Sequence, residues 1–288
     1  MNKIGIVTDS ASDITWEYAD KNEVTIVPLT IINEDKSFKE TRDYDFKKHY
    51  NNYEIDKNFL PKTSQPTPQE FYKAFEKLIE QGKKDIIVIC ISGALSGTLN
   101  SINVASKNIK STQQDVTLHI IDSKNASYAE GFLIEEAIDL IKKGQSAKEI
   151  TTHLEKLVKN IFSFLLIPSL KYLYRGGRIS LTRYLAARLL RKMVIIRTAE
   201  DGSLEPVGAI GSIKEGLEKI TKLVTNDGKR FPRKIALVYA TNEKLKNQAE
   251  THLKEYITTK EEMRIVQTRA AITAHVGPSA IAIVADFG

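Results

Sequence analysis

The sequence has a single cysteine, no long hydrophobic run and no metal-ligand pattern, and each absence excludes a class of protein. Because Cys90 is the only cysteine among 288 residues, no disulfide forms within the chain, which favours a reducing compartment. No run of about 18 apolar residues occurs, so the sequence predicts no membrane-spanning helix. The five histidines are scattered without metal-ligand spacing, and we expect no metal site.

The N-terminal segment and the composition favour a soluble, cytoplasmic, globular protein. Residues 1–9 are not a secretory signal, because their apolar stretch is short and Asp9 follows it at once. Hydrophobic residues make up 42% of the chain and charged residues 27%, which is ordinary for a protein with a core and excludes a disordered chain. The length suits two domains.

Short β-branched runs alternate with amphipathic segments through the first half of the chain. We expect strands at 3–7, 24–30, 85–91 and 116–121, and helices at 69–81, 98–109 and 128–143. This alternation predicts βαβ units around a parallel sheet, with ligands beyond the carboxyl ends of its strands. Residues 36–62 lack periodicity and are expected to form a long excursion with one helix at 44–50.

The pattern changes near residue 160, after a helix expected at 146–160. Beyond it we expect strands at 163–167, 193–198, 204–210, 234–239, 264–267 and 281–285, and helices at 213–224 and 243–256. Asp201-Gly202 between two apolar runs indicates a hairpin. The predicted fold is α/β with two domains: an N-terminal parallel-sheet domain over 1–160 and a C-terminal α+β domain with antiparallel strands over 161–288.

The first polar segment with a possible function is Thr63-Ser64-Gln65-Pro66. Thr67 and Glu70, three residues apart, form a capping box, which explains those two residues without any function. The preceding Thr63, Ser64 and Gln65 form either a hydroxyl-rich turn or part of a site.

The second segment, Ser92 to Thr98, follows a buried strand and leads into a helix. Glycines there let backbone N–H groups approach an anion, and the helix N-terminus adds partial positive charge. With the hydroxyls of Ser96 and Thr98, this is either a carboxylate or phosphate site or a plain helix cap. The alternative reading is a lipid hydrolase or acyl transferase that uses Ser96. The spacing Gly-x-x-Ser-Gly differs from that of a nucleophile elbow, which argues against it.

The third segment, 171–197, holds eight Lys and Arg residues and no acidic residue. It could face an acidic protein, a phosphate, anionic lipid or nucleic acid. A solvated helix face explains Arg183, Arg188 and Arg191, but explains less well Arg175 and Arg178, which flank two glycines. The sequence has no signature of a nucleic-acid-binding fold, which argues against a nucleic-acid partner.

The fourth segment contains His275, which precedes Gly277-Pro278 and is expected at a turn between apolar strands. A lone histidine is more often structural than functional, and both readings stay open.

Taken together, these segments resemble the DegV family. The matching segments, in the family's order, are Gly5 to Ser10, Thr63 to Pro66, Ser92 to Thr98, Asp122-Ser123, Tyr174 to Arg178 and His275 to Pro278. The resemblance implies a two-domain α/β fold that holds one long-chain fatty acid between the domains and needs no cofactor. One departure is Ala94, where the family often carries a polar or charged residue.

The resemblance also implies roles for individual residues. The fatty-acid carboxylate would meet the hydroxyls of Thr63 and Ser96, with Ser64, Gly97 and Thr98 close by and His275 near the head group. Some members are binding subunits of a bacterial fatty acid kinase, which present the carboxylate to a separate ATP-using subunit. The chain would then be a non-catalytic lipid carrier in fatty acid metabolism, with at most transient membrane contact. Arg175 and Arg178 would steer the head group, the acyl phosphate or the kinase.

Overall fold

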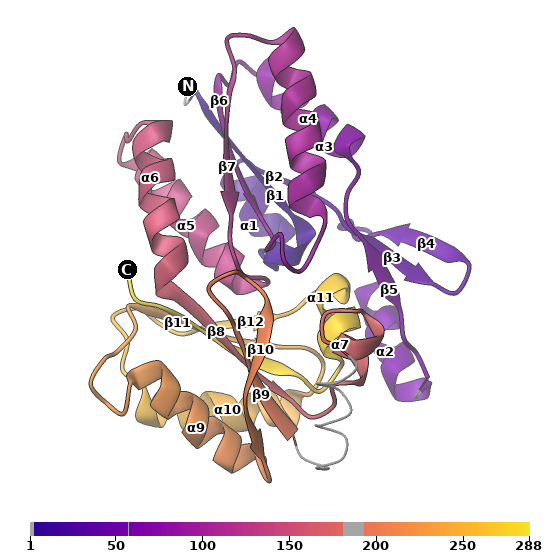
Figure 1. Cartoon of the computed structure of the whole chain (residues 1–288), viewed down its shortest axis with the longest axis vertical. Coiled ribbons are helices and arrows are strands. Elements are labelled where there is room, and N and C mark those ends of the chain that lie inside the picture. Colours follow the sequence, from indigo (N-terminus) through magenta and orange to yellow (C-terminus); the bar gives the residue numbers. More distant parts are fainter. Residues whose placement is uncertain (1–2, 57, 181–192) are drawn as a thin grey trace.

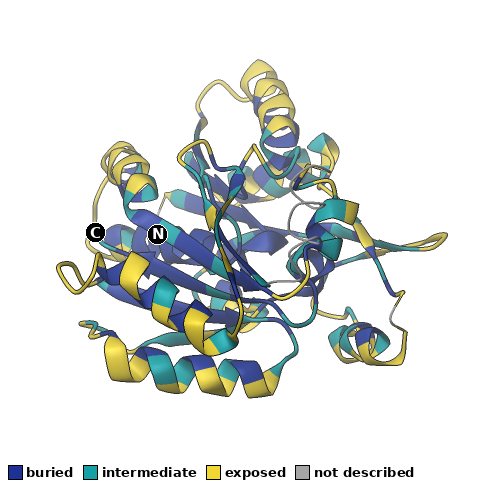
Figure 2. Ribbon diagram, turned by 60° about the horizontal axis from the view of Figure 1, so that its bottom comes forward, coloured by how far each residue is buried: buried dark blue, intermediate teal, exposed yellow. Residues whose placement is uncertain are grey.

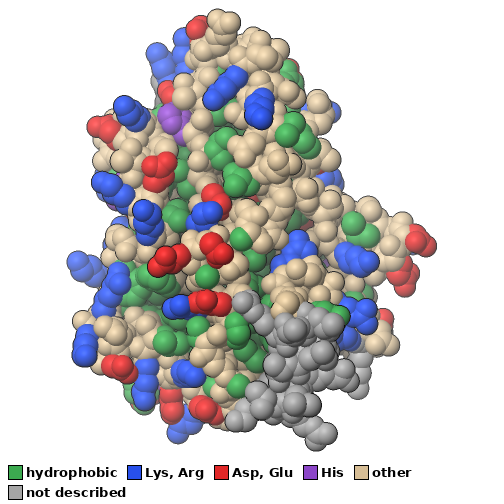
Figure 3. Space-filling view, viewed as in Figure 1, with side chains coloured by type: hydrophobic (Ala, Val, Ile, Leu, Met, Phe, Trp, Pro, Cys, Tyr) green, Lys and Arg blue, Asp and Glu red, His purple; other side chains and the backbone are tan. Residues whose placement is uncertain are grey.

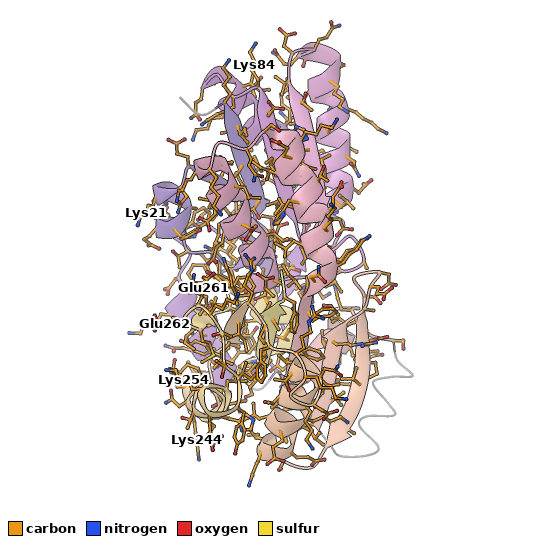
Figure 4. The ribbon with its side chains drawn as sticks, turned by 90° about the vertical axis from the view of Figure 1, so that its left-hand side faces the viewer. Lys21, Lys84, Lys244, Lys254, Glu261 and Glu262 are labelled. Carbon is orange, nitrogen blue, oxygen red and sulfur yellow. The ribbon has the colours of Figure 1, made fainter. Side chains whose placement is uncertain are left out.

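The structure is a computed structural model that describes residues 3–56, 58–180 and 193–288. It contains a parallel four-stranded sheet, a mixed six-stranded sheet and a small three-stranded sheet. Seen from the side, the parallel sheet and the six-stranded sheet follow one another along the long axis, with Lys84 near one end and Lys244 near the other (Figure 4). Among the helices of residues 3–56, 58–180 and 193–288, none combines the length with the apolar composition that a membrane-spanning segment needs.

The N-terminal half confirms the predicted parallel sheet, whose order is β2-β1-β6-β7. Its strands are β1 (Ile4–Asp9), β2 (Val24–Val27), β6 (Asp85–Cys90) and β7 (Thr117–Asp122). Helices α3 (Pro68–Glu80) and α4 (Thr98–Thr112) pack on one face, and α1 (Trp16–Lys21), α5 (Tyr128–Lys142) and α6 (Ala147–Leu157) on the other (Figure 1). The central strand β6 is buried on both faces, as its continuous apolar run predicts.

The C-terminal half confirms the change to antiparallel pairing. Its strands are β8 (Ile161–Ile167), β9 (Met193–Thr198), β10 (Leu204–Ile210), β11 (Lys234–Tyr239), β12 (Arg264–Gln267) and β13 (Ile281–Asp286). They lie in the order β10-β9-β8-β13-β11-β12, and β11 with β12 is the parallel pair. Helices α9 (Ile213–Thr225) and α10 (Glu243–Tyr256) cover one face. Buried strands occupy the centre and exposed residues gather on the outer faces of the helices (Figure 2).

Helix α5 is shared by both halves of the molecule. It contacts β6 of the parallel sheet and also β8 and β13 of the six-stranded sheet, and most of its residues are buried. One hydrophobic cluster therefore runs across the position 160, where we predict the domain boundary. The strands do divide between the sheets at β8, but the division into domains stays a prediction.

Two predictions for the segment between β2 and α3 have different outcomes: the single strand at 24–30 is wrong, whereas the one helix expected within 36–62 is present but is accompanied by two unpredicted strands. The run 24–30 is not one strand, because β2 ends at Val27 and β3 (Thr30–Asn33) pairs in a different sheet beyond Pro28. The excursion 36–62 contains β4 (Lys36–Lys39), α2 (Phe46–Ile55) and β5 (Lys62–Ser64). The strand order is β4-β3-β5, and we name this the small sheet. It extends to one side of the body in Figure 1.

Three short helices were not predicted, namely α1, α7 (Lys171–Arg175) and α11 (Ala270–Val276). The expected turn at His275 is wrong, because this residue lies in the last turn of α11. The helix ends at Gly277, whose φ of 85° lies in the left-handed region. A side chain at this position would also collide with the Tyr172 ring.

Candidate ligand-binding site

A mostly apolar cavity lies between the six-stranded sheet, α11 and the loop that follows β6. It encloses about 920 Å³ of space not filled by atoms, part of which opens to solvent. Leu165, Val238 and Ala282 line it from the sheet, while Leu95 and Ile272 line it from the other elements. A mostly apolar lining with a few polar side chains is usual for small-molecule sites.

Thr63 and His275 form the first polar contact of this cavity. The pairing of β5 with β3 fixes Thr63 opposite Ile31, and the Thr63 Oγ1 lies 2.7 Å from the His275 Nε2. The His275 Nδ1 is buried and has no hydrogen-bond partner among the described residues. Burial, with a smaller contribution from the positive charge of Arg178, lowers the pKa of His275 to about 3. The imidazole is therefore neutral at neutral pH.

The loop before α4 supplies the second hydroxyl, Ser96. The Ser96 Oγ lies 2.8 Å from the Thr98 Oγ1 and accepts from the Thr98 backbone N–H at 3.3 Å. Gly97 brings this loop against the Thr63-Ser64-Gln65 segment, because a Cβ there would lie 2.6 Å from the Gln65 amide nitrogen. The two hydroxyl-rich segments of the sequence are therefore neighbours in space.

Arg178 reaches the cavity from the loop after α7. Its Nε donates to the Leu95 carbonyl at 3.0 Å, and its guanidinium also donates to the Gly176 carbonyl. Burial lowers the pKa of Arg178 from its ordinary value. A Cβ on Gly176 would overlap with the His275 ring, so the first of the paired glycines permits this close approach. Among the described lining residues, Arg178 is the only one with a full charge.

The structure brings half of the predicted site residues to the cavity. Thr63, Ser96, Arg178 and His275 line it, and we name them the head-group residues. The others lie outside its lining: Ser64 and Arg175 are exposed, Thr98 is buried, and Gly97 is partly buried. Arg183, Arg188, Arg191 and Lys192 of the basic segment lie outside the described residues.

The apolar lining residues of the sheet carried no functional signal in the sequence. Leu165 pairs with Ala282, which pairs in turn with Val238, so the three form one row across β8, β13 and β11. Residues at such positions look like core, because an apolar cavity wall and a packed core need the same side chains. What the whole arrangement can bind is a long apolar body with an anionic end.

Comparison with known proteins agrees with this architecture. A family model described as "Uncharacterised protein, DegV family" matches residues 3–287. The chain belongs to the DegV family. A DegV domain-containing protein of Staphylococcus aureus is 34% identical over 292 residues, covering 99% of both chains.

Solved structures of DegV family proteins share the fold. The structure of "DegV, a fatty acid binding protein from Bacillus subtilis" is similar with a TM-score of 0.85 and 27% identity, covering 99% of both chains. The "fatty acid binding DegV family protein" of Streptococcus agalactiae has a TM-score of 0.88 over 100% of both chains at 20% identity. The second likeness concerns the fold alone.

Replacing His275 by glutamine is expected to flatten the dependence of stability on pH. The folded chain protonates His275 near pH 3, whereas an unfolded chain does so near pH 6.5. The unfolded state therefore binds more protons between these values, and stability is lost as the pH falls from about 6.5 towards 3. Between pH 6 and 4 the free energy of unfolding should therefore fall more steeply in the wild type than in His275→Gln, by about 1.4 kcal/mol per pH unit. Urea unfolding of both proteins measures this, and equal slopes would contradict the burial of a neutral imidazole.

Proposed function

We propose that this DegV family protein binds one long-chain fatty acid, with the acyl chain in the apolar cavity and the carboxylate at the head-group residues. The observation that carries the proposal is the composition of the lining, in which one arginine, one neutral histidine and several hydroxyls, those of Thr63 and Ser96 among them, accompany a mostly apolar wall. The fatty-acid binding named for the Bacillus subtilis protein supports it.

The cavity and the head-group residues would contribute differently to binding. A sixteen-carbon chain buries about 14 methylenes, which at about 0.8 kcal/mol each gives on the order of 11 kcal/mol before costs. Association then costs several kcal/mol, and a hydrogen bond to a charged group contributes about 1.5–3 kcal/mol. The apolar wall therefore supplies most of the affinity, and the hydroxyls fix which end of the ligand faces outward.

Arg178 gives the site its preference for an acid. A partly buried charge is costly unless a counter-charge or hydrogen bonds compensate it. Two backbone carbonyls accept from the guanidinium, and no carboxylate belongs to the described lining. A ligand carboxylate supplies the missing negative charge, while the neutral His275 does not oppose it.

The alternative of a serine-dependent hydrolase or acyl transferase fits the geometry less well. The Ser96 Oγ is hydrogen-bonded to the Thr98 side chain rather than to a histidine, and the Nε2 of His275 is hydrogen-bonded to Thr63. A serine nucleophile needs a histidine base that a third group orients, but the Nδ1 of His275 has no partner among the described residues. We therefore propose a non-catalytic carrier, which a fluorophosphonate probe should leave unlabelled at Ser96.

A nucleic-acid partner has little support from the placement of the basic residues that the structure describes. Arg178 lines the cavity, and Arg197 pairs with Glu205, so these two do not add to one basic surface. On the face drawn in Figure 3, Lys and Arg side chains are interspersed with Asp and Glu over its left-hand side. A phosphate backbone would require several cations on one face.

We further propose that the protein presents the fatty acid to a separate ATP-using kinase subunit in the cytoplasm. The sequence contains no Walker loop, which agrees with a phosphoryl donor that is bound by another chain. Arg175 is exposed at the end of α7, three residues before Arg178. It is therefore available to a partner that approaches the head-group end.

Arg175→Ala is expected to leave the palmitate affinity within about twofold, because the residue lies outside the cavity lining. The kinase-dependent rate of acyl-phosphate formation at low carrier concentration should fall by about tenfold, the equivalent of 1.4 kcal/mol of docking energy. Lys84→Ala is the matched control, since it removes an exposed cation at the far end of the molecule (Figure 4). Equal rates for both variants would exclude Arg175 from the docking surface.

Calorimetric titration of the delipidated protein tests the binding proposal. We expect one palmitate per chain, weaker binding of hexadecanol, and no heat from a short DNA duplex at about 0.15 M salt. Saturable DNA binding with no palmitate binding would favour the nucleic-acid alternative.

A further inference from the structure

The cavity does not explain why the Thr8-Asp9-Ser10 segment at the end of β1 is polar and fully buried. Its Ser10 hydroxyl accepts from the Leu29 backbone N–H at 3.0 Å and donates to the Glu40 Oε2 at 2.5 Å. Glu40 is itself 0% exposed, immediately after β4. A buried carboxyl is costly unless hydrogen bonds satisfy it, so the contacts of Glu40 indicate what it stabilises.

The second contact of Glu40 is the N-terminal end of α11. The Ala271 backbone N–H donates to the Glu40 Oε1 at 2.7 Å. The first N–H groups of a helix lack partners within the helix, and the N-cap side chain usually accepts from one of them. Here the N-cap residue is Arg269, which makes no such bond and has no acceptor atom to offer. Glu40 therefore supplies the cap from a distant part of the sequence.

The two ends of α11 are consequently attached to the same small sheet. At the N-terminal end, the Ala271 backbone N–H of the helix donates a hydrogen bond to the Glu40 carboxyl. The backbone N–H of Glu40 in turn donates to the Leu29 carbonyl next to β3. Near the C-terminal end, His275 is bonded to Thr63 on β5, which pairs with β3. With both ends held, α11 cannot turn or slide relative to the sheet without breaking one of these bonds.

We propose that Glu40 is a positioning residue for the head-group site: by capping α11 and joining it to the small sheet, it holds His275 against Thr63. Ser10 acts on the same hydrogen bond by orienting the Glu40 carboxyl, which gives this one residue of the buried Thr8-Asp9-Ser10 segment a role in ligand recognition. The inference rests on the proposed function for its binding consequence, but its structural consequence is measurable without any ligand.

The ligand-free measurement is the titration of the His275 imidazole by NMR. In the wild type the ring is buried and faces Thr63 and Arg178, which keeps its pKa at about 3. Glu40→Ala releases the helix, so water reaches the ring and its pKa should rise by at least about one unit towards the ordinary ~6.5. Glu40→Gln should restore the wild-type titration. Because burial raises the pKa of Glu40 to about 7, a neutral amide of the same shape keeps the acceptor for Ala271.

The ligand measurement compares palmitate with hexadecanol, which share the chain and differ in the head group. Glu40→Ala should lower the affinity for palmitate by about tenfold, the equivalent of about one hydrogen bond to a charged group. It should lower the affinity for hexadecanol by less than about twofold. A variant that merely loosens the fold would weaken both ligands alike. Glu136→Ala is the matched control, because it removes a buried carboxylate that pairs with Arg233, and it should leave the palmitate-to-hexadecanol ratio unchanged.

The outcomes separate this inference from the proposed function. The positioning role would be overturned if His275 titrates in Glu40→Ala as it does in the wild type. It would also be overturned if Glu136→Ala lowers the palmitate-to-hexadecanol affinity ratio as much as Glu40→Ala does. If the wild type binds neither lipid, the proposed function fails, and the titration still decides whether Glu40 holds His275. If Glu40→Ala does not fold, Ser10→Ala provides the same test. We expect a smaller rise in the pKa of His275 in this variant, and no rise would refute the positioning role.

Discussion

Replacing Ala282 by phenylalanine is expected to lower the affinity for palmitate by about 100-fold. Ala282 lies near the start of β13 between Leu165 and Val238, where its methyl group faces the cavity. A phenyl ring there occupies space that several methylenes of the acyl chain need. Excluding about four methylenes, at about 0.8 kcal/mol each, costs roughly 3 kcal/mol of binding energy, which corresponds to a factor of about 100.

Ile265→Phe is the control for this substitution, because it places the same ring on the edge strand β12 of the same sheet at a position that is already 38% exposed. Thermal melts should show both variants folded, and displacement of a fluorescent fatty acid should show the loss only for Ala282→Phe. Ala282→Val should shift the preference towards shorter acyl chains. Wild-type affinity in Ala282→Phe would mean that the chain does not lie along this face of the sheet.

Thr63→Ala and Ser96→Ala are each expected to weaken palmitate binding by roughly tenfold to 100-fold. Each variant loses a hydroxyl at the head-group end of the cavity, and a hydrogen bond to a carboxylate is worth about 1.5–3 kcal/mol. Calorimetry with palmitate and with hexadecanol should show the larger loss for the acid. Both variants should stay folded, because the Thr63 hydroxyl is hydrogen-bonded to the His275 side chain and the Ser96 hydroxyl only to Thr98, two residues along the same loop.

Ser64→Ala is the matched control for these two variants. Ser64 is adjacent to Thr63 and is part of the same hydroxyl-rich segment, but it is exposed and outside the cavity lining. Its removal should leave the palmitate affinity within about twofold. A loss as large as that of Thr63→Ala would show that the carboxylate lies further out than the cavity lining indicates.

The parallel sheet could be predicted because its strands are continuous apolar runs that end in polar loops. The small sheet could not, because its strands are three or four residues long and β4 is almost wholly exposed. Its register joins Thr30 to Ser64 across a helix, and nothing local in the sequence specifies that pairing. Helix α11 has only seven residues, most of them small and apolar, which is too short for a periodic pattern.

The candidate site was predictable where polar residues follow buried strands, and not elsewhere. Thr63 and Ser96 stand out as hydroxyls in loops, and Arg178 stands out beside paired glycines. Glu40 does not, because Lys39 before it and Thr41 after it make the segment look like a solvated loop. Its burial results from contacts with Ser10 and with α11, which the chain brings together only through the tertiary fold.

The central claim is that the cavity holds one long-chain fatty acid, and native mass spectrometry of the purified protein tests it most directly. We predict a population heavier than the chain by the mass of one fatty acid of about 14 to 18 carbons, released on denaturation and identified in the lipid extract. The Ala282→Phe protein, purified in parallel, should lack this population. A wild-type protein that carries no such ligand, and takes up none when palmitate is added, would contradict the account.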